Sequence, residues 1–246
     1  MTKKLINTFK VTSDKSCGLL HTTDLHSHLI PNIDDGVKSL EESVHIIVQL
    51  KDLGFKKIIV TPHIMSHRFP NNKKSIYQGY LSLKNELIER KIDFDIKVAA
   101  EYYYDEHFLE LIENKELLTF GDNYVLFECS YQLKPFALEQ TVAKLRKAGY
   151  KAILAHPERY SYYNKKSDYL RLKKMGLLLQ INAISMEGFY GKIIQKKVEK
   201  IVNLGIVDFI GSDIHSQMYV DSFSTHLKSK TYLKIFEKNK IQNDYL

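Results

Sequence analysis

Two histidines one residue apart, His26 and His28, close a segment that the sequence predicts to be a β-strand, residues 22–28. Side chains at positions i and i+2 of a strand point to the same face of a sheet. The two imidazole rings therefore lie side by side, which suits the binding of one metal ion. Burial alone explains the pair less well, since each polar ring would need its own buried hydrogen-bond partner. A short His-x-His pattern is common in proteins that bind no metal, so the prediction of a metal site depends on residues elsewhere in the chain.

The same kinds of residue recur where other apolar runs of the chain end. Seven short runs rich in β-branched residues alternate with helix-like segments, and six of them finish in histidine, aspartate or glutamate. The residues at these ends are His26, His28, His63, Glu101, Glu128, His156, Asp213 and His215, and the loop after the first run adds Asp34 and Asp35. Each of them alone would more often be a loop residue or a helix cap than a metal ligand.

The order of the predicted elements brings these residues together. The predicted strands cover residues 18–24, 57–63, 95–101, 124–128, 151–157, 177–182 and 207–213. The predicted helices cover residues 39–54, 73–91, 105–116, 136–148, 167–175, 190–204 and 225–239. Alternating strands and helices indicate parallel βα units, and near-continuous apolar strands fit a sheet buried on both faces. The sequence therefore predicts an α/β fold with one closed or nearly closed barrel, whose strand C-termini all open onto the face that hosts active sites.

The open end of this barrel would form a bowl lined by imidazoles and carboxylates, and we expect such a bowl to bind cations. Neighbouring carboxylates raise one another's pKa, and divalent ions relieve that repulsion. The donors are nitrogen and oxygen with no thiolate, which suits manganese, iron or zinc better than calcium or magnesium. Nine donors exceed the needs of one ion, so two or three ions are expected, with Glu101 as the bridging carboxylate.

The other residues with reactive side chains are predicted to be structural or solvent-exposed. Four histidines lie inside predicted elements or in the tail: His21, His45, His107 and His226. Cys129 follows Glu128, so strand alternation turns it to the opposite face. A phosphatase with a cysteine nucleophile would need an Arg six residues after its Cys, where this chain has Thr23 and Pro135.

The distribution of charge along the chain bears on its possible partners and on its domain organisation. The net charge is +7, but residues 1–18 and 226–246 carry +3 each, which leaves about +1 for the rest and disfavours nucleic acid as a partner. We interpret residues 1–18 as a basic N-terminal extension and residues 19–246 as a single domain.

The sequence also predicts where the protein works. It contains no apolar run of membrane-spanning length and no signal-type segment, so we expect a cytoplasmic protein without membrane insertion. The two cysteines, Cys17 and Cys129, form no disulfide framework, which suits a reducing compartment.

Taken together, the motifs resemble those of the PHP (polymerase and histidinol phosphatase) superfamily. Within it they are most similar to the manganese-dependent protein-tyrosine phosphatases of bacterial capsule and exopolysaccharide operons. The resemblance covers about residues 20–217 and rests on Asp24-Leu25-His26-Ser27-His28, Asp34-Asp35-Gly36, Thr61-Pro62-His63, Ala100-Glu101, Phe127-Glu128, Ala155-His156-Pro157-Glu158-Arg159-Tyr160 and Ser212-Asp213-Ile214-His215.

The resemblance implies a distorted (β/α)7 TIM-like barrel, the PHP fold, with a three-ion site at the C-terminal ends of the strands. The ligand sets that it implies are His26, His28, Glu101 and Asp213 for the first ion, Glu101, Glu128 and His156 for the second, and Asp35, His63 and His215 for the third. Manganese is the expected metal, with iron or zinc as alternatives. The implied catalytic set is Arg159, which would bind phosphate, with His156 and Asp213.

One departure from the family pattern concerns a second arginine. Relatives carry a further Arg shortly after the last Asp-x-His, whereas residues 216–227 contain no Arg or Lys. Either Arg159 acts alone with the metals, or Arg68 in the loop after His63 takes this role; Arg68 could equally be a solvated loop residue.

The implied reaction is metal-assisted hydrolysis of phosphotyrosine. The implied substrate is the tyrosine-rich tail of a bacterial tyrosine autokinase that drives polysaccharide export, which would regulate capsule or exopolysaccharide synthesis. The first alternative is a small-molecule phosphatase of the histidinol phosphate type, and a nucleic-acid-binding or nuclease module is a further alternative. The tyrosine clusters at 102–104 and 160–163 would line a peptide groove or pack the barrel rim, and the sequence leaves the oligomeric state open.

Overall fold

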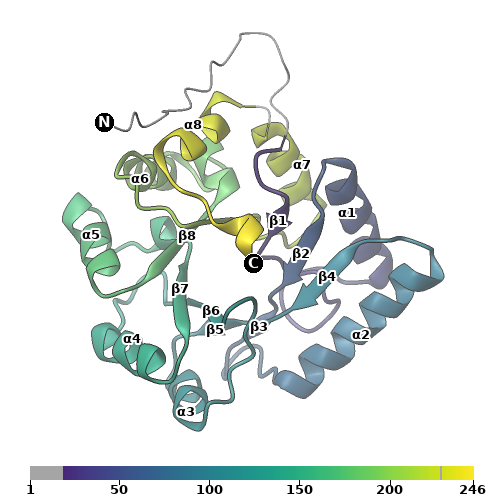
Figure 1. Cartoon of the computed structure of the whole chain (residues 1–246), viewed down its shortest axis with the longest axis horizontal. Helices are drawn as coiled ribbons and strands as arrows, with labels where there is room; N and C mark the ends of the chain where they lie inside the picture. The colour runs from purple at the N-terminus through teal and green to yellow at the C-terminus, as the bar shows by residue number, and fades with distance from the viewer. Residues whose placement is uncertain (1–18, 228) are drawn as a thin grey trace, which may run out of the picture.

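Parallel strands and helices alternate along the computed structural model, which describes residues 19–227 and 229–246 (Figure 1). The predicted basic extension, residues 1–18, lies outside the described residues. The strands are β1 Thr23–Asp24, β2 Lys57–Val60, β3 His63–Ile64, β4 Asp95–Val98, β5 Glu101–Tyr103, β6 Tyr124–Glu128, β7 Lys151–Ala155, β8 Leu178–Asn182 and β9 Phe209–Gly211. The α-helices are α1 Leu40–Asp52, α2 Lys73–Glu89, α3 Glu106–Asn114, α4 Leu138–Lys147, α5 Lys166–Lys174, α6 Lys192–Asn203, α7 Gln217–His226 and α8 Lys230–Lys238. Short 3-10 turns are η1 Pro157–Arg159, η2 Ala183–Glu187 and η3 Asn243–Tyr245.

The strands form two parallel sheets, with orders β1-β2-β4 and β3-β5-β6-β7-β8-β9. Two of the predicted strands contribute to both sheets, because each breaks for two residues and then resumes in the other sheet. The first breaks after Val60 and resumes at His63, and the second breaks after Val98 and resumes at Glu101. Backbone hydrogen bonds continue across the breaks, with Ala99 N donating to Val60 O (2.9 Å) and Glu101 N donating to Pro62 O (3.1 Å). The nine short strands therefore correspond to the seven predicted βα units.

The barrel does not close into one continuous ladder among the described residues. One isolated parallel bridge, Ser27 to Ile214, connects the chain after β1 with the chain after β9. Two backbone hydrogen bonds accompany it, from His28 N to Ile214 O (2.9 Å) and from Asp213 N to His26 O (2.8 Å). The fold is thus a nearly closed barrel rather than a closed one, and the seam lies where His26 and His28 follow β1 and where Asp213 and His215 follow β9.

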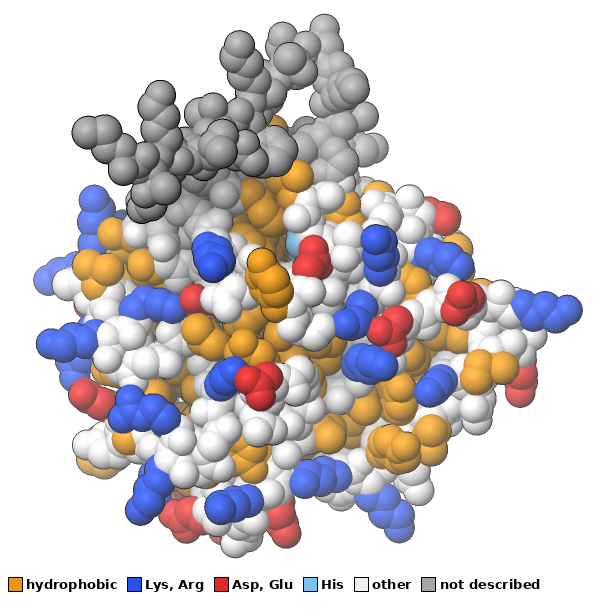
Figure 2. All heavy atoms as spheres, in the orientation of Figure 1, with side chains coloured by type: hydrophobic (Ala, Val, Ile, Leu, Met, Phe, Trp, Pro, Cys, Tyr) orange, Lys and Arg blue, Asp and Glu red, His pale blue; other side chains and the backbone are white. Residues whose placement is uncertain are grey.

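Strand alternation divides the core into an inner and an outer part. On β6, Leu126 belongs to a small cluster inside the ring of strands, whereas Val125 and Phe127 belong to the large cluster beneath the helices. The helices surround the strands (Figure 1), and their outer surfaces carry interspersed Lys, Arg, Asp and Glu side chains on the face drawn in Figure 2. Because Glu128 is two residues after Leu126, the same alternation aims its carboxylate inward.

The predicted start and end of α1 agree with the structure, with one difference in detail. Ser39 is the N-cap, and its Oγ accepts a hydrogen bond from Glu42 N (3.1 Å). The Glu42 carboxylate reaches back as expected, but it accepts from Lys38 N (2.9 Å), one residue before the cap. Gly54 follows the helix with φ 104°, a left-handed conformation that glycine adopts without steric cost.

The predicted tail helix over residues 225–239 is present as α8, which starts later than predicted, and a helix that the sequence did not predict, α7, precedes it. Residues 217–226 form α7, although Ser, Thr and β-branched residues give this stretch a weak helix propensity. It is stabilised by packing instead, since Val220 and Phe223 are buried at i, i+3 spacing. Ser229 then caps a new helix by accepting from Tyr232 N (3.1 Å). Within residues 19–227 and 229–246, no helix combines the length and the apolarity needed to span a membrane.

Candidate metal centre

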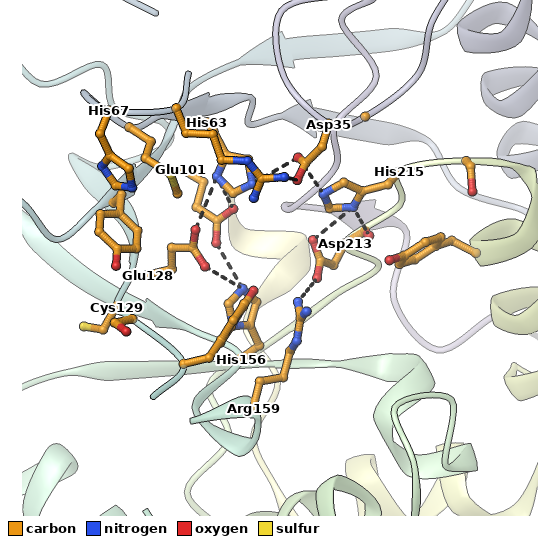
Figure 3. A pocket seen from close by; sticks show the side chains of 18 of the residues that line it. Asp35, His63, His67, Glu101, Glu128, Cys129, His156, Arg159, Asp213 and His215 are labelled. Atoms are coloured by element: carbon orange, nitrogen blue, oxygen red, sulfur yellow. Dashed lines mark hydrogen bonds and ion pairs between the residues drawn. The ribbon is translucent and has the colours of Figure 1, made fainter. Parts of the chain in front are cut away.

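The predicted donors meet in one bowl at the C-terminal ends of the strands, and Figure 3 shows all of them except His26 and His28. His26 and His28 follow β1, Asp35 lies in the loop before α1, and His63 and Glu101 open β3 and β5. Glu128 ends β6, His156 follows β7, and Asp213 and His215 follow β9. Seven of these side chains are buried, whereas the Asp35 side chain is 36% exposed and that of His215 16% exposed.

The His26 and His28 rings face each other and share their acidic neighbours. Their Nε2 atoms are 3.2 Å apart. Glu101 Oε2 lies 3.1 Å from His26 Nε2 and 3.4 Å from His28 Nε2. Asp213 Oδ1 lies 3.4 Å and 3.5 Å from the same two atoms. The four side chains therefore direct their donor atoms at one small space, as the spacing of the two histidines predicts.

Two further groups of donors adjoin this space. Asp35, His63 and His215 form one of them with His28, and each offers an atom within 4.8 Å of the others. The other group is Glu101, Glu128 and His63, and His156 Nε2 lies 3.1 Å from Glu101 Oε1 and 3.9 Å from Glu128 Oε2. Glu101 thus lies between the first space and the second, the position expected of a bridging carboxylate.

The chemistry of this bowl fits divalent cations. Four of its buried donor atoms have no hydrogen-bond partner: Asp35 Oδ1, His63 Nδ1, Glu101 Oε2 and His156 Nδ1. Burial and the charges of Glu101 and Asp213 raise the pKa of Glu128 well above its ordinary value. Unpaired buried donors and crowded carboxylates are both costly, and cations would relieve both costs. The donor set contains nitrogen and oxygen only, as the sequence predicts.

Hydrogen bonds behind the histidines orient their rings. Asp34 Oδ2 lies 2.8 Å from His28 Nδ1 and accepts from the His63 backbone N (3.0 Å). The sequence allows Asp34 as a ligand, but the structure places it behind His28. Burial would raise the pKa of Asp34, but the charge of His28 outweighs this effect and holds the pKa below its usual range. Gln180 Oε1 lies 2.9 Å from His26 Nδ1. Such contacts fix the tautomer, so that each Nε2 is left free as a donor to a metal.

Sequence reasoning missed Gln180 and Asn182, on the strand whose end carries no predicted ligand. Gln180 Nε2 donates to Asn182 Oδ1 (2.9 Å), and Asn182 Nδ2 donates to Asp213 Oδ2 (2.6 Å). The Asn182 backbone N donates to Glu158 Oε1 (2.9 Å), a carboxyl whose pKa burial raises to about 7. Two buried amides at i, i+2 in an otherwise apolar strand were the available signal. Strand β8 therefore supports the ligands of its neighbours.

Arg159 reaches into the bowl from the turn after β7 (Figure 3). Its Nη1 lies 3.0 Å from Asp213 Oδ2. The guanidinium is held between two aromatic rings, with its Cζ 4.5 Å from the ring centres of both Tyr131 and Tyr190. The side chain is 22% exposed, so it remains accessible from the cavity. The rings fix its plane while leaving its donors available for an anion.

Several backbone positions at the site are strained or closely packed. His156 and Asp213 adopt φ of 34° and 53°, which is unfavourable for residues with a Cβ and is concentrated at functional sites. Gly36 and Gly211 leave no room for a side chain. A Cβ on Gly36 would lie 2.1 Å from His28 O, and one on Gly211 would lie 2.8 Å from His26 Cβ. The glycine of Asp34-Asp35-Gly36 therefore allows the loop to approach His28.

A cavity of about 790 Å³ lies over the donors. Its walls include Arg68, Tyr103 of the tyrosine cluster at 102–104, and two residues that the sequence did not assign to the site, His67 and Tyr219. Arg68 Nη2 lies 3.5 Å from Asp35 Oδ2, and 61% of the side chain is exposed. Arg68 thus borders the site at Asp35, whereas Arg159 contacts Asp213, and Arg68 is well solvated there.

The four histidines predicted to lie outside the site do so, whereas Cys129 borders the cavity. His45 is exposed on α1, and the His107 side chain is 40% exposed. His21 and His226 are buried, with Nδ1 atoms 2.9 Å from Tyr232 Oη and 3.2 Å from Glu187 Oε1. The Cys129 side chain is buried. Burial, together with a smaller effect of the Glu128 charge, raises the pKa of its thiol, whereas a nucleophile needs a lowered pKa.

Comparisons with known proteins agree with this geometry. The sequence profile of a family described as "Capsular polysaccharide synthesis, CpsB/CapC" matches residues 22–232. CapC of Staphylococcus aureus is 31% identical over 195 residues, which cover 78% of this chain and 76% of CapC. The tyrosine-protein phosphatase CpsB of Streptococcus pneumoniae is 30% identical over 200 residues, covering 78% of this chain and 82% of CpsB.

Solved structures show the same fold. A structure from a study of YwqE from Bacillus subtilis and CpsB from Streptococcus pneumoniae, described as metal-dependent tyrosine phosphatases, superimposes with a TM-score of 0.76 at 23% identity. It covers 87% of this chain and 91% of that one. A histidinol phosphate phosphatase from Lactococcus lactis has a TM-score of 0.51 at 17% identity, covering 85% of this chain and 93% of that one. Together with the profile match, these likenesses bear out the resemblance inferred from the motifs: the chain belongs to the CpsB/CapC family of capsular polysaccharide synthesis.

Proposed function

We propose that this chain is a metal-dependent protein-tyrosine phosphatase that removes phosphate from a tyrosine autokinase and thereby regulates capsule or exopolysaccharide synthesis. The observation that carries the proposal is the bowl itself. It combines unpaired buried nitrogen and oxygen donors with an arginine held open to the cavity, in a chain of the CpsB/CapC family. Relatives named tyrosine-protein phosphatase support this choice of activity.

The proposed cofactors are three divalent ions, with manganese first and iron or zinc as alternatives. His26, His28, Glu101 and Asp213 would hold the first ion. Glu101, Glu128 and His156 would hold the second, and Asp35, His63 and His215 the third. When bound, such ions supply Lewis-acid activation of water and neutralise charge on phosphoryl oxygens.

The residues of the chain have distinct proposed roles in phosphoester hydrolysis. Arg159 would bind and orient the phosphoryl group through charge-assisted hydrogen bonds. Asp213 and the rings of Tyr131 and Tyr190 fix its guanidinium. His156, hydrogen-bonded to Glu101, would keep that carboxylate aimed into the bowl. A tyrosine leaving group has an ordinary pKa near 10, so it departs more readily than an alkoxide and needs only weak proton donation, which a site histidine could supply.

The shape of the cavity favours a phosphorylated side chain on a larger molecule over a small enclosed substrate. The rim consists of exposed residues, among them Arg68 and Leu133, and the volume of about 790 Å³ is large for a single small phosphomonoester. We propose the phosphotyrosine tail of a bacterial tyrosine autokinase as the substrate and the cytoplasm as the site of action. The histidinol phosphate activity remains the alternative that the assay has to exclude.

One assay tests the proposal. Metal-reconstituted protein is supplied with a phosphotyrosine peptide, a phosphoserine peptide and histidinol phosphate, alongside a His156→Ala variant. We expect hydrolysis of the phosphotyrosine peptide in preference to the other two, and a large loss of this activity in the variant. A strong preference for histidinol phosphate would overturn the proposed substrate, and equal activity of variant and wild type would overturn the proposed site.

A further inference from the structure

Three large apolar side chains are exposed in the loop that joins β6 to α4. Tyr131 is 39% exposed, Leu133 75% and Phe136 92%. Tyr131 and Leu133 line the cavity, and Phe136 follows three residues after Leu133. Single exposed apolar residues are normal on soluble proteins, but several of them in one loop that borders a functional cavity indicate a binding surface. We define Leu133 and Phe136 as the rim patch.

The backbone of this loop is held in place although these side chains face solvent. Tyr162 Oη donates to Ser130 O (3.0 Å), and the Ser161 backbone N donates to Tyr131 O (2.8 Å). Farther along, Tyr104 Oη donates to Phe136 O (2.7 Å). Ala137, directly after the patch, adopts a left-handed φ of 57°, which is unfavourable for an L residue with a Cβ. The rim patch is therefore presented by a fixed loop, and its exposure needs an explanation other than disorder.

The loop that carries the rim patch is also a wall of the catalytic cavity. Leu133 lines that cavity together with Tyr131 and Gln132. The ring of Tyr131 in turn packs on the Arg159 guanidinium, with the ring centre 4.5 Å from Arg159 Cζ. A tyrosine whose phosphate bound to Arg159 would thus have its neighbouring residues beside this loop.

We propose that the rim patch binds an apolar residue that flanks the phosphotyrosine of a polypeptide substrate. This inference rests on the proposed phosphatase function and adds the determinant by which a protein substrate is preferred to a small phosphomonoester. Contact with an aliphatic side chain would remove apolar surface of Leu133 and Phe136 from water on binding. Since the loop is already fixed, little additional ordering is needed to form this contact.

The test compares two phosphotyrosine peptides that differ only at the residues on either side of the tyrosine, which are leucine in one and serine in the other. The measured quantity is the ratio of kcat/KM for the two peptides in the metal-reconstituted protein. We expect the wild type to favour the leucine peptide by about fivefold to tenfold, chiefly through KM. In Leu133→Ser and in Phe136→Ser the ratio should fall toward one.

Ile193→Ser provides the matched control, because Ile193 is 74% exposed on α6 and does not line the cavity. It should keep the wild-type ratio. A wild-type ratio near one, or an undiminished ratio in the Leu133→Ser, Phe136→Ser double variant, would overturn the inference and leave the phosphatase proposal intact. Failure of the wild type to hydrolyse either peptide would overturn the proposed function and this inference with it.

Discussion

At the scale of single residues, two side chains of the metal centre are held by amides of one strand. Gln180 Oε1 lies against His26 Nδ1, and Asn182 Nδ2 donates to Asp213 Oδ2. The sequence shows these amides only as a polar pair at i, i+2 in an apolar strand, a pattern that is compatible with many environments. Their roles depend on which side chain lies opposite, as with Gln180 Oε1 at 2.9 Å from His26 Nδ1, and only the three-dimensional structure supplies that partner.

The support of His26 leads to a prediction about metal affinity. Replacing Gln180 with leucine removes the acceptor that fixes the tautomer of His26, and such losses typically weaken metal binding by about 10-fold to 100-fold. Competition with a chelator of known affinity measures the change. Gln140→Leu on the exposed surface of α4 is the control and should bind metal as the wild type does. Unchanged affinity in Gln180→Leu would show that the hydrogen bond has no role in ligation.

The stacking of Arg159 leads to a second prediction at this scale. Arg159→Lys keeps a positive charge but loses the planar group held between Tyr131 and Tyr190. We expect kcat/KM for a phosphotyrosine peptide to fall by about 10²-fold, the typical loss when one oriented donor to the transition state is removed. Steady-state kinetics measure this, with Arg171→Lys on α5, whose side chain is 64% exposed, as the control. Wild-type kinetics in Arg159→Lys would contradict the assigned role.

At the scale of elements, periodic apolar runs predicted the strands and most helices well, and caps marked several ends. The splitting of two strands at 61–62 and 99–100 was missed. Pro62 in the first break offers no N–H to a strand ladder, whereas Ala99 and Ala100 in the second carry no such mark. The helix α7 was missed for a different reason. Its sequence has weak helix propensity, and it forms because Val220 and Phe223 find buried positions that depend on the rest of the fold.

The boundary between α7 and α8 can be tested through its cap. Ser229 Oγ accepts from Tyr232 N, so Ser229→Ala removes this capping hydrogen bond. We expect the free energy of unfolding to fall by about 1 kcal/mol, the usual cost of losing an N-cap. Urea denaturation measures it, with Ser222→Ala inside α7 as the control. If the two substitutions had the same effect, a continuous helix would describe this region better.

At the scale of the whole molecule, most histidines are buried, and this makes stability depend on pH. His21 is buried against Tyr232, and burial, opposed in part by the charge of Asp244, lowers its pKa from 6.5 to about 4. The unfolded chain therefore binds a proton at a higher pH than the folded chain does. Stability contributed by neutral His21 is fully present above about pH 6.5 and is lost progressively as the pH falls toward 4.

Substitution of His21 by phenylalanine should reduce this pH dependence. From the two pKa values, the free energy of unfolding should fall by about 2 kcal/mol less between pH 7 and pH 5 in the variant than in the wild type. Urea denaturation at both pH values gives this difference directly. His45→Phe is the control, because His45 is exposed on α1 and should not alter the pH dependence. Parallel pH dependence in His21→Phe and the wild type would contradict the role of burial.

For the whole molecule, we expect phosphotyrosine hydrolysis to depend on divalent ions held by the nine donors of the bowl. The most direct measurement follows metal content and the hydrolysis rate of a phosphotyrosine peptide together, as a chelator removes the ions and manganese is added back. We predict that activity disappears in the metal-free protein and returns as about three ions bind per chain. Full activity in protein that carries no metal would contradict it.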